Sequence, residues 1–450
     1  MKPSTIALIS TAVIASFGIG YLIHFDYQRR HNPEARKQKK IERKKAAKQE
    51  KELKQKEIES VESLIQSILG NVSKEKLPTT AEAIEAYFVD QIALGEECIK
   101  QGNDNASVEH FYKALKVYPA PLELIMIYQK TVPERVYRMI VTLMAMEQQQ
   151  RQNKFYQEFP PPEVHLKLKE LAREGEESTF ELVAQKDIKA GERIYTEKPL
   201  VSALYPQLQG FYCHYCMKKL DTDRQVECAN CDLVKYCSVE CEQQAAQEYH
   251  QFLCTNNKIS ADTRALGFYQ FSLDNKLKYP QMIAQFLSCM VAEEVEKKKA
   301  TKAGSSVYTN WDHIERFKSD TLEISEESVR ETALIKELLN SKIPGLDEFL
   351  KDDIYLLMKS KLMYNCFEVS TEEQVSITVD KPKSESARIL KENQYGLGSA
   401  VYKISSYITS VYDADESNVH VTFKDNTNVL VVAAHRDIKQ GETIKVLAVK

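Results

Sequence analysis

The cysteine and histidine residues between positions 213 and 254 constrain the fold of this chain more than any other feature. Seven of the ten cysteines fall within these 42 residues. Zinc takes four Cys or His ligands in a tetrahedral arrangement, and two ligands separated by two residues reach one metal from a tight turn. Eight ligands therefore predict two zinc sites with no open coordination position, which favours a structural or protein-binding role. The expected ligands are Cys213, Cys216, Cys228, Cys231, Cys237, Cys241, His250 and Cys254.

The spacing of these ligands resembles that of a MYND zinc finger. After the first pair, 11, 2, 5, 3, 8 and 3 residues separate successive members. The cross-braced pattern of that family implies that one zinc binds the first and third pairs and the other binds the second and fourth. The implied groups are Cys213, Cys216, Cys237 and Cys241 on one ion, and Cys228, Cys231, His250 and Cys254 on the other. Disulfide bonding is the alternative, and a cytosolic location argues against it.

An apolar run near the amino end predicts where the chain resides. Residues Ile6 to Ile23 carry no charged side chain, and about 20 apolar residues span a bilayer as a helix. Only Lys2 precedes the run, whereas 13 Lys or Arg against 6 Asp or Glu lie between Asp26 and Ile58. By the positive-inside rule, the run is a single-pass anchor that leaves the bulk of the chain in the cytosol. A buried core helix and a cleaved signal peptide are the alternatives.

Charge divides the chain into a basic stalk and an acidic remainder. The net charge is −4, and because residues 1–58 sum to +8, residues 59–450 carry −12. The stalk at 26–58 favours contact with anionic lipid head groups, at about 1 kcal/mol per base. The acidic remainder suits basic partners and argues against nucleic acid, although an ordinary solvated surface explains the charge equally well.

Short amphipathic helices are predicted from residue 81 to residue 146. The large, small, aromatic and helix-ending positions of one tetratricopeptide repeat are matched by Leu94, Gly95, Phe111, Ala114 and Pro119. One repeat cannot bury a continuous core, so further helices must complete the domain. Phe88 with Ile92, and Leu124 with Ile127 and Tyr128, form two apolar stripes at helical spacing. Two stripes can form a groove for an amphipathic helix, although ordinary core packing is the alternative for each.

Residues 1 to 146 resemble the small presequence receptor family of the mitochondrial outer-membrane translocase. The resemblance rests on the order of anchor and basic stalk, on the segment 87–97 (YFVDQIALGEE) and on the segment 129–133 (QKTVP). It implies a groove that binds the apolar face of an amphipathic presequence, and association with other translocase subunits. The matching groove positions are Phe88, Val89, Ile92, Ile127 and Tyr128. Tyr128 stands where the family often has an aliphatic residue.

A polar stretch and the consecutive prolines at 160–162 predict a linker at 151–163, because proline excludes helix. Beyond the linker, residues 182–194 and 434–444 are near copies of each other. Each copy is typical of a strand, a Gly-containing turn and a second strand. Two β units at opposite ends of one domain, with helices between them, predict a split β-rich fold.

A finger placed between two such β units resembles the SET- and MYND-domain lysine methyltransferase family, over residues 164 to 450. Asn365, Cys366 and Phe367 resemble that family's Asn-Ser-Phe element near the cofactor, S-adenosylmethionine. Its Gly-rich cofactor loop should lie just before residue 182, and its Asn-His-Ser-Cys motif should follow Ser405; this chain has neither pattern. The family's terminal tyrosine falls at about Ala448.

These departures predict that the SET-like part does not bind S-adenosylmethionine and has no catalytic residue, because methyl transfer depends on positioning donor and acceptor. Asn365 and Asn418 are the remaining candidates for cofactor contact. The helical region from 261 to 361, interrupted by a charged loop at 293–306, is expected to serve packing and partner contacts.

The sequence thus predicts a multidomain α+β protein with a single transmembrane helix, a small all-α tetratricopeptide-like domain, and a split β-rich SET-like domain with an inserted finger and helical inserts. The expected domains are an anchor at 1–25, a stalk at 26–58, a receptor-like domain at 59–150, a linker at 151–163, SET-like parts at 164–212 and 365–450, a finger at 213–254 and a helical insert at 255–364. The predicted function is a mitochondrial outer-membrane import receptor. A membrane-tethered protein-lysine methyltransferase and a zinc-finger scaffold for proline-rich peptides are the alternatives.

Overall fold

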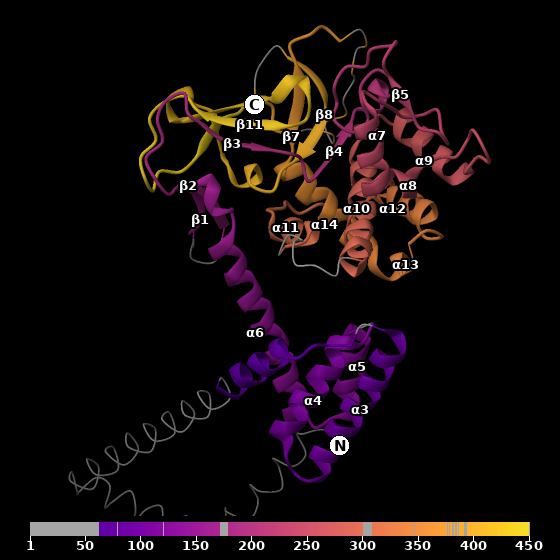
Figure 1. Cartoon of the computed structure of the whole chain (residues 1–450), viewed down its shortest axis with the longest axis vertical. Coiled ribbons are helices and arrows are strands. Elements are labelled where there is room, and N and C mark those ends of the chain that lie inside the picture. The colour runs from indigo at the N-terminus through magenta and orange to yellow at the C-terminus, as the bar shows by residue number, and fades with distance from the viewer. Residues whose placement is uncertain are drawn as a thin grey trace, which may run out of the picture. The chain divides into compact units, whose positions relative to one another are not determined.

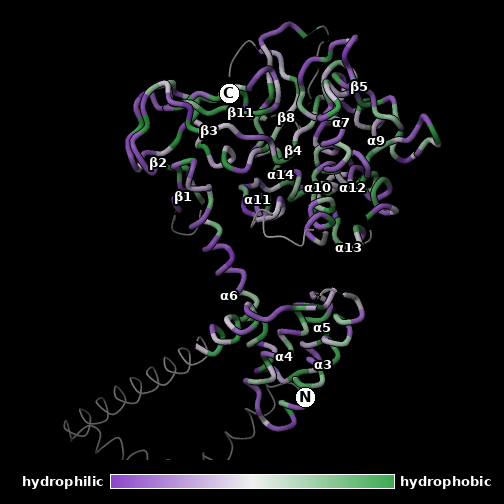
Figure 2. The backbone as a smooth tube through the Cα atoms, viewed as in Figure 1, coloured by the Kyte–Doolittle hydropathy of each residue, from purple (hydrophilic) through white to green (hydrophobic). Residues whose placement is uncertain are grey.

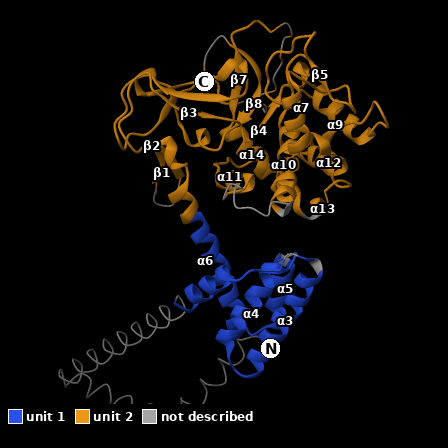
Figure 3. Cartoon of the chain, viewed as in Figure 1, with its two compact units in different colours: residues 1–152 blue, residues 153–450 orange. Residues whose placement is uncertain are grey.

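The computed structural model describes residues 63–449, except positions 79, 120 and 344, the segments 172–178 and 300–307, and several positions between 376 and 393. It divides the chain into two compact units, residues 1–152 and residues 153–450 (Figure 3). The expected anchor and stalk lie outside the described residues. Within the described part, no helix is both long and apolar enough to cross a bilayer.

The first unit is built from helices around its own core (Figure 1). Residues 63–74 are helical, and they are followed by α3 (Ala81–Lys100), α4 (Asp104–Val117), α5 (Pro121–Thr131) and α6 (Glu134–Glu158). Asn103 begins α4, because its side chain accepts a hydrogen bond from the amide of Ala106. The core includes Ile65, Ile68, Val108, Phe111, Tyr112, Leu115, Leu124, Tyr128, Val136, Ile140 and Leu143.

A glycine permits the close packing of α3 on α4. A Cβ atom at Gly95 would lie 2.9 Å from the ring of Phe111, whose side chain is buried. Ala114, one turn further along α4, is fully buried as well. The small and aromatic positions of the predicted repeat are therefore packing positions, and the predicted helix-turn-helix is present.

Helix α6 extends further than the sequence suggested. It ends at Glu158, so the first half of the predicted linker at 151–163 is helical. Phe155 and Phe159 are buried in the core of the second unit, with their rings stacked at 5.0 Å. Burial of these two side chains holds the polar segment in a helix, and irregular chain begins only at Phe159.

The strands of the second unit form four sheets in the described part of the chain. Antiparallel β1 (Leu166–Leu171) and β2 (Thr179–Ala184) make one sheet, and the others have the orders β3-β11-β10-β12-β9, β4-β8-β7 and β5-β6. The bounds are β3 (Arg193–Glu197), β4 (Val201–Leu204), β5 (Val226–Glu227), β6 (Lys235–Tyr236), β7 (Phe367–Thr371), β8 (Tyr395–Val401), β9 (Thr409–Val411), β10 (Val419–Phe423), β11 (Leu430–Ala434) and β12 (Lys445–Leu447). Segments far apart in the sequence therefore share sheets, as the split fold requires.

The two near-copy segments pair with each other reciprocally. Ile188 and Ile438 each donate a backbone hydrogen bond of 2.9 Å to the carbonyl of the other. Asp187 accepts the amide of Gln440 at 2.9 Å, and Asp437 accepts the amide of Ala190 at the same distance. The two copies in the sequence thus pair through pseudo-symmetric hydrogen bonds, which join the two ends of the unit.

Helices fill the chain between the two β parts. They are α7 (Val239–Ala245), the π-helical turn η3 (Ala246–His250), α8 (Gln251–Leu253), α9 (Thr263–Asp274), α10 (Tyr279–Lys299), α11 (Asn310–Arg316), α12 (Glu326–Leu339), α13 (Leu346–Phe349) and α14 (Asp352–Asn365). Hydrophobic and hydrophilic residues are interleaved along them (Figure 2). α10 runs on to Lys299, through the first part of the expected charged loop, and Lys297 forms ion pairs there with Glu293 and Glu294.

Candidate metal centres, receptor surface and cofactor elements

The first metal centre draws its ligands from a tight turn and from the start of a helix. Cys213 and Cys216 come from the turn that opens the finger, while Cys237 follows β6 and Cys241 lies in α7. The sulfur of Cys237 lies 3.5 Å from that of Cys216 and 3.7 Å from that of Cys241. Ser238 begins α7 by accepting the amide of Cys241 at 3.3 Å. This cap fixes the start of the helix that carries Cys241, directly after Cys237.

The second centre is fully buried. Cys228 and Cys231 lie on the segment between β5 and β6, and His250 and Cys254 flank α8. The Nε2 atom of His250 lies 3.5 Å from the sulfur of Cys231, and the sulfurs of Cys228 and Cys254 are 3.9 Å apart. The amide of Asn230 points to the sulfur of Cys228 at 3.4 Å, which favours a thiolate there.

The structure groups the eight residues as the MYND resemblance implies. Within each group of four, all ligand atoms lie within 4.8 Å of one another. Four sulfurs, or three sulfurs and one imidazole nitrogen, are donor sets of structural zinc, and such closed sites leave no position for water or substrate. The donor sets therefore fit two zinc ions with a folding role.

The expected groove residues of the first unit differ in exposure. Val89 on α3 and Ile127 on α5 are 59% and 49% exposed, and Phe88 and Ile92 are half-buried against the core. Tyr128 is only 2% exposed, and its hydroxyl donates to the carbonyl of Phe111 at 3.1 Å. Tyr128 is thus a core residue beneath the surface that the other four reach.

Two residues that the sequence did not single out lie next to these positions. Met126 on α5 is 57% exposed. Tyr118, at the end of α4, holds its ring 5.0 Å from that of Phe88. Residues 124–128 are all apolar, apart from the hydroxyl of Tyr128. The sequence therefore could not predict which of these side chains face the solvent. We call Phe88, Val89, Ile92, Met126 and Ile127 the apolar surface.

Both candidate cofactor asparagines use their side-chain amide N–H groups within the chain itself. Asn365 donates to the carbonyls of Lys361 at 2.7 Å and Lys318 at 2.8 Å. Asn418 donates to the carbonyl of Thr443 and to Glu442, and its Oδ1 atom accepts the amide of Lys445. Both side chains therefore tie chain segments together. Residues 175–178 of the expected cofactor loop lie outside the described part.

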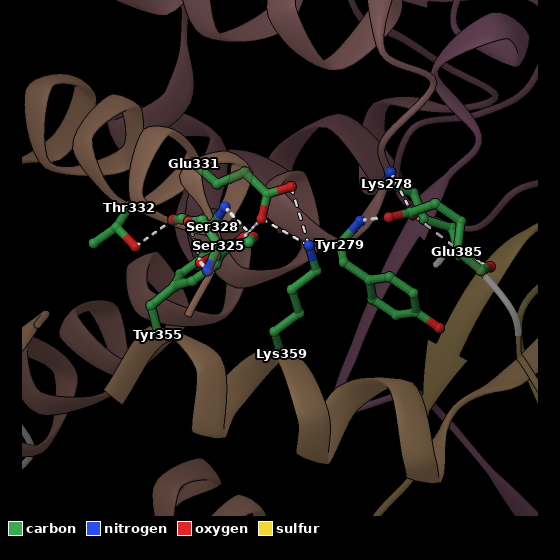
Figure 4. A network of polar contacts seen from close by, with 9 residues as sticks. All are labelled: Lys278, Tyr279, Ser325, Ser328, Glu331, Thr332, Tyr355, Lys359 and Glu385. Atoms are coloured by element: carbon green, nitrogen blue, oxygen red, sulfur yellow. Dashed lines mark hydrogen bonds and ion pairs between the residues drawn. The ribbon is translucent and has the colours of Figure 1, made fainter. Parts of the chain in front are cut away.

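Figure 4 shows two buried lysine–glutamate pairs, one between α12 and α14 and the other between the start of α10 and the segment that precedes β8. On α12, Glu331 accepts a hydrogen bond from Tyr355 at 2.5 Å and from Lys359 at 2.7 Å. Lys278 lies 3.6 Å from Glu385, and both of these side chains are fully buried. Burial lowers the pKa of Lys278 and raises the pKa of Glu385, and each charge opposes that shift in the other. The second pair fastens the segment around Glu385 to the start of α10.

The fold and these sites define a helical receptor-type domain fused to a zinc-finger unit. Comparison with known proteins supports this division into two units. The family model of the MAS20 protein import receptor matches residues 8–157, and the MYND finger model matches residues 213–254. The chain therefore belongs to the MAS20 family of protein import receptors.

Individual relatives support both halves. The mitochondrial import receptor subunit TOM20 of Saccharomyces cerevisiae is 36% identical over 141 residues, which are 31% of this chain and 76% of the relative. The Neurospora crassa subunit tom20 is 36% identical over 153 residues, 32% of this chain and 82% of the relative. The protein-lysine N-trimethyltransferase SMYD5 of Gallus gallus is 27% identical over 147 residues, 26% of this chain but only 35% of the relative. That match fits the second unit.

Proposed function

We propose that this chain is a mitochondrial outer-membrane import receptor that binds amphipathic presequences on its apolar surface and works with other translocase subunits. Membership of the import receptor family supports the proposal, and the exposure of Val89, Met126 and Ile127 is the observation that carries it. Under this proposal the chain crosses the outer membrane once, with its basic stalk against anionic lipid and both described units in the cytosol.

Apolar contact should dominate the affinity for a presequence. Burying a Val- or Ile-sized side chain contributes roughly 1.5–3 kcal/mol, whereas an exposed ion pair contributes about 0–1 kcal/mol. Glu96 and Glu97, both exposed on α3, would face the basic side of the presequence helix. Their charges should therefore mainly accelerate encounter, and their effect should fade as salt is added.

Substitutions on α3 test this assignment. Because a charge on the apolar surface cannot be buried unpaired, Val89→Asp and Ile92→Asp should weaken binding of a fluorescent presequence peptide by roughly 10- to 100-fold. Glu97→Gln should weaken it slightly, and only at low salt. Leu94→Asp is the matched control, since Leu94 is 40% exposed on the same helix but two residues from Ile92 and therefore on another face. Equal losses in Val89→Asp and Leu94→Asp, with helicity unchanged by circular dichroism, would contradict the assignment.

We propose further that the second unit is a zinc-stabilised module without methyltransferase activity. The commitment of both asparagine amides to the chain itself supports this. A membrane-tethered protein-lysine methyltransferase is the second candidate, and the match to SMYD5 favours it. Labelled methyl groups appearing on the chain or on added protein lysines, and lost in Asn365→Ala, would establish that candidate instead.

A further inference from the structure

One arginine of the chain lies between the two elements that should hold S-adenosylmethionine in a SET-like unit. Arg388 comes from the segment between β7 and β8, outside both elements. Its Nη2 atom donates to the carbonyl of Asn365 at 2.8 Å and of Ser406 at 3.4 Å, and its Nη1 atom donates to the carbonyl of Ile408 at 3.2 Å. The guanidinium carbon lies 4.2 Å from the centre of the Phe367 ring.

These contacts join the two cofactor elements through one side chain. Asn365 and Phe367 belong to the element that resembles the Asn-Ser-Phe motif. Ser406 and Ile408 belong to the segment in which the Asn-His-Ser-Cys motif is expected. A guanidinium is planar and carries its donors in a fixed fork, so it can serve several carbonyls and stack on an aromatic ring at once.

We propose that Arg388 is an internal substitute for a cofactor: its guanidinium bridges the two elements permanently, and the SET-like unit folds around this side chain in place of S-adenosylmethionine. The residues of the site do not fit the cofactor, since their carbonyls and ring are engaged and both asparagine amides are committed elsewhere. The proposal concerns the second unit alone and does not rest on presequence binding.

Hydrogen bonds hold the chain at Glu385, Arg388 and Ile389, which are described positions of this segment. The backbone of Arg388 forms two hydrogen bonds with residues at the start of β7. Its amide donates to the carbonyl of Cys366 at 3.1 Å, and its carbonyl accepts from the amide of Glu368 at 2.9 Å. Glu385 accepts the amides of Lys278 and Tyr279 at 2.8 and 3.2 Å (Figure 4). After Arg388, the carbonyl of Ile389 accepts the amide of Val449 at 2.8 Å.

The charge on Arg388 persists despite its surroundings. Burial lowers the pKa of Arg388 to about 10, and the group therefore remains a cation at neutral pH. Carbonyl oxygens and an aromatic face are both favourable partners for a guanidinium cation. Removing the cation would leave the carbonyls of Asn365 and Ile408 without this donor, which is costly for buried groups.

Chemical rescue tests the proposal with the full chain in mild detergent. Arg388→Ala should lower the melting temperature of the second unit by about 5 °C or more, and guanidinium chloride at low millimolar concentration should restore part of that loss. Equal concentrations of sodium chloride or urea should not. Arg388→Lys is the matched variant: it keeps the charge but lacks the fork, so it should melt between the wild type and Arg388→Ala.

Cofactor binding supplies the second readout. The wild type should show no change in melting temperature with S-adenosylmethionine or S-adenosylhomocysteine, whereas presequence binding should be the same in wild type and Arg388→Lys. Saturable binding of either cofactor to the wild type would overturn the proposal. So would an Arg388→Ala chain that is as stable as the wild type, or equal stability of Arg388→Lys and wild type if the alanine variant does not fold.

Discussion

At the scale of single residues, the packing of the receptor unit depends on a glycine in α3. Gly95 faces the ring of Phe111 so closely that any Cβ atom must displace it. The sequence could predict this position, because a small residue opposite an aromatic one is part of the repeat pattern. It could not predict that Tyr128 would be buried, since Tyr128 lies in an uninterrupted apolar run.

Gly95→Ala should destabilise the receptor unit by about 1–3 kcal/mol, because overpacking forces the Phe111 ring from its position. Gly70→Ala is the matched control in the helix at 63–74. No atom lies within 4 Å of the Cβ position at Gly70, so alanine there should be neutral or stabilising by about 0.5–1 kcal/mol. Urea unfolding monitored by circular dichroism compares the two. A Gly95→Ala variant as stable as Gly70→Ala would contradict the packing account.

A buried histidine should give the second unit an acid-sensitive stability. Burial, assisted by the nearby charge of Lys403, lowers the pKa of His313 to about 3. Between the pKa of about 6.5 in the unfolded chain and the pKa of about 3 in the folded chain, only the unfolded chain binds the proton. The contribution of His313 to stability is therefore fully present above pH 6.5 and is lost as the pH falls toward 3. The loss should approach about 1.4 kcal/mol per pH unit.

His313→Phe removes this titration and retains an aromatic ring beside Phe155 and Phe159, which contact His313 at 5.3 and 4.8 Å between ring centres. Urea unfolding at pH 7 and pH 5.5 should show a smaller loss for the variant than for the wild type. Comparing the two at each pH cancels acid effects that they share, such as weakened zinc binding. Equal losses would refute the role of His313.

At the scale of elements, the sequence predicts those elements that have a regular local pattern. It does not predict the features that depend on contacts formed only in the folded chain. The helix-turn-helix at 81–117, the paired β units and the eight metal ligands follow from periodicity, turn residues and ligand spacing, whereas the division of the ligands into two groups of four follows from the resemblance to the MYND family. The first half of the predicted linker at 151–163 is helical because Phe155 and Phe159 bury their side chains in the core of the second unit, and these contacts exist only in the folded unit. Arg388 had no signal, since its acceptors are backbone carbonyls that any residue supplies.

The finger is the element whose stability should depend on metal. Thiolate ligation is coupled to folding, so the reduced chain should hold two zinc ions, and a chelator should make residues 213–254 sensitive to protease. Cys228→Ala should lower the zinc content, while Cys98→Ala, a half-buried cysteine outside the finger, should leave it unchanged. Metal analysis by mass spectrometry measures this directly. A folded, reduced chain without zinc would contradict the assignment of both centres.

At the scale of the whole molecule, two units with separate cores carry separate chemistry. The first unit exposes apolar side chains from α3 and α5, and it is the part of the chain that matches the import receptor family. The second unit commits its candidate cofactor residues to its own chain, brings together two donor sets that fit zinc, and contains buried lysine–glutamate pairs. The sequence predicted this division through the two family resemblances, while the exposure of each surface residue required the folded structure.

The most direct test of the receptor function is a side-by-side titration of the full chain with a presequence peptide and with S-adenosylmethionine. The peptide should bind saturably, and a peptide of the same composition whose order destroys the amphipathic helix should bind at least roughly 10-fold more weakly, because its apolar residues no longer share one face. S-adenosylmethionine should produce no binding signal. Equal affinity for both peptides, together with saturable binding of S-adenosylmethionine, would contradict the account and identify the chain as a tethered methyltransferase.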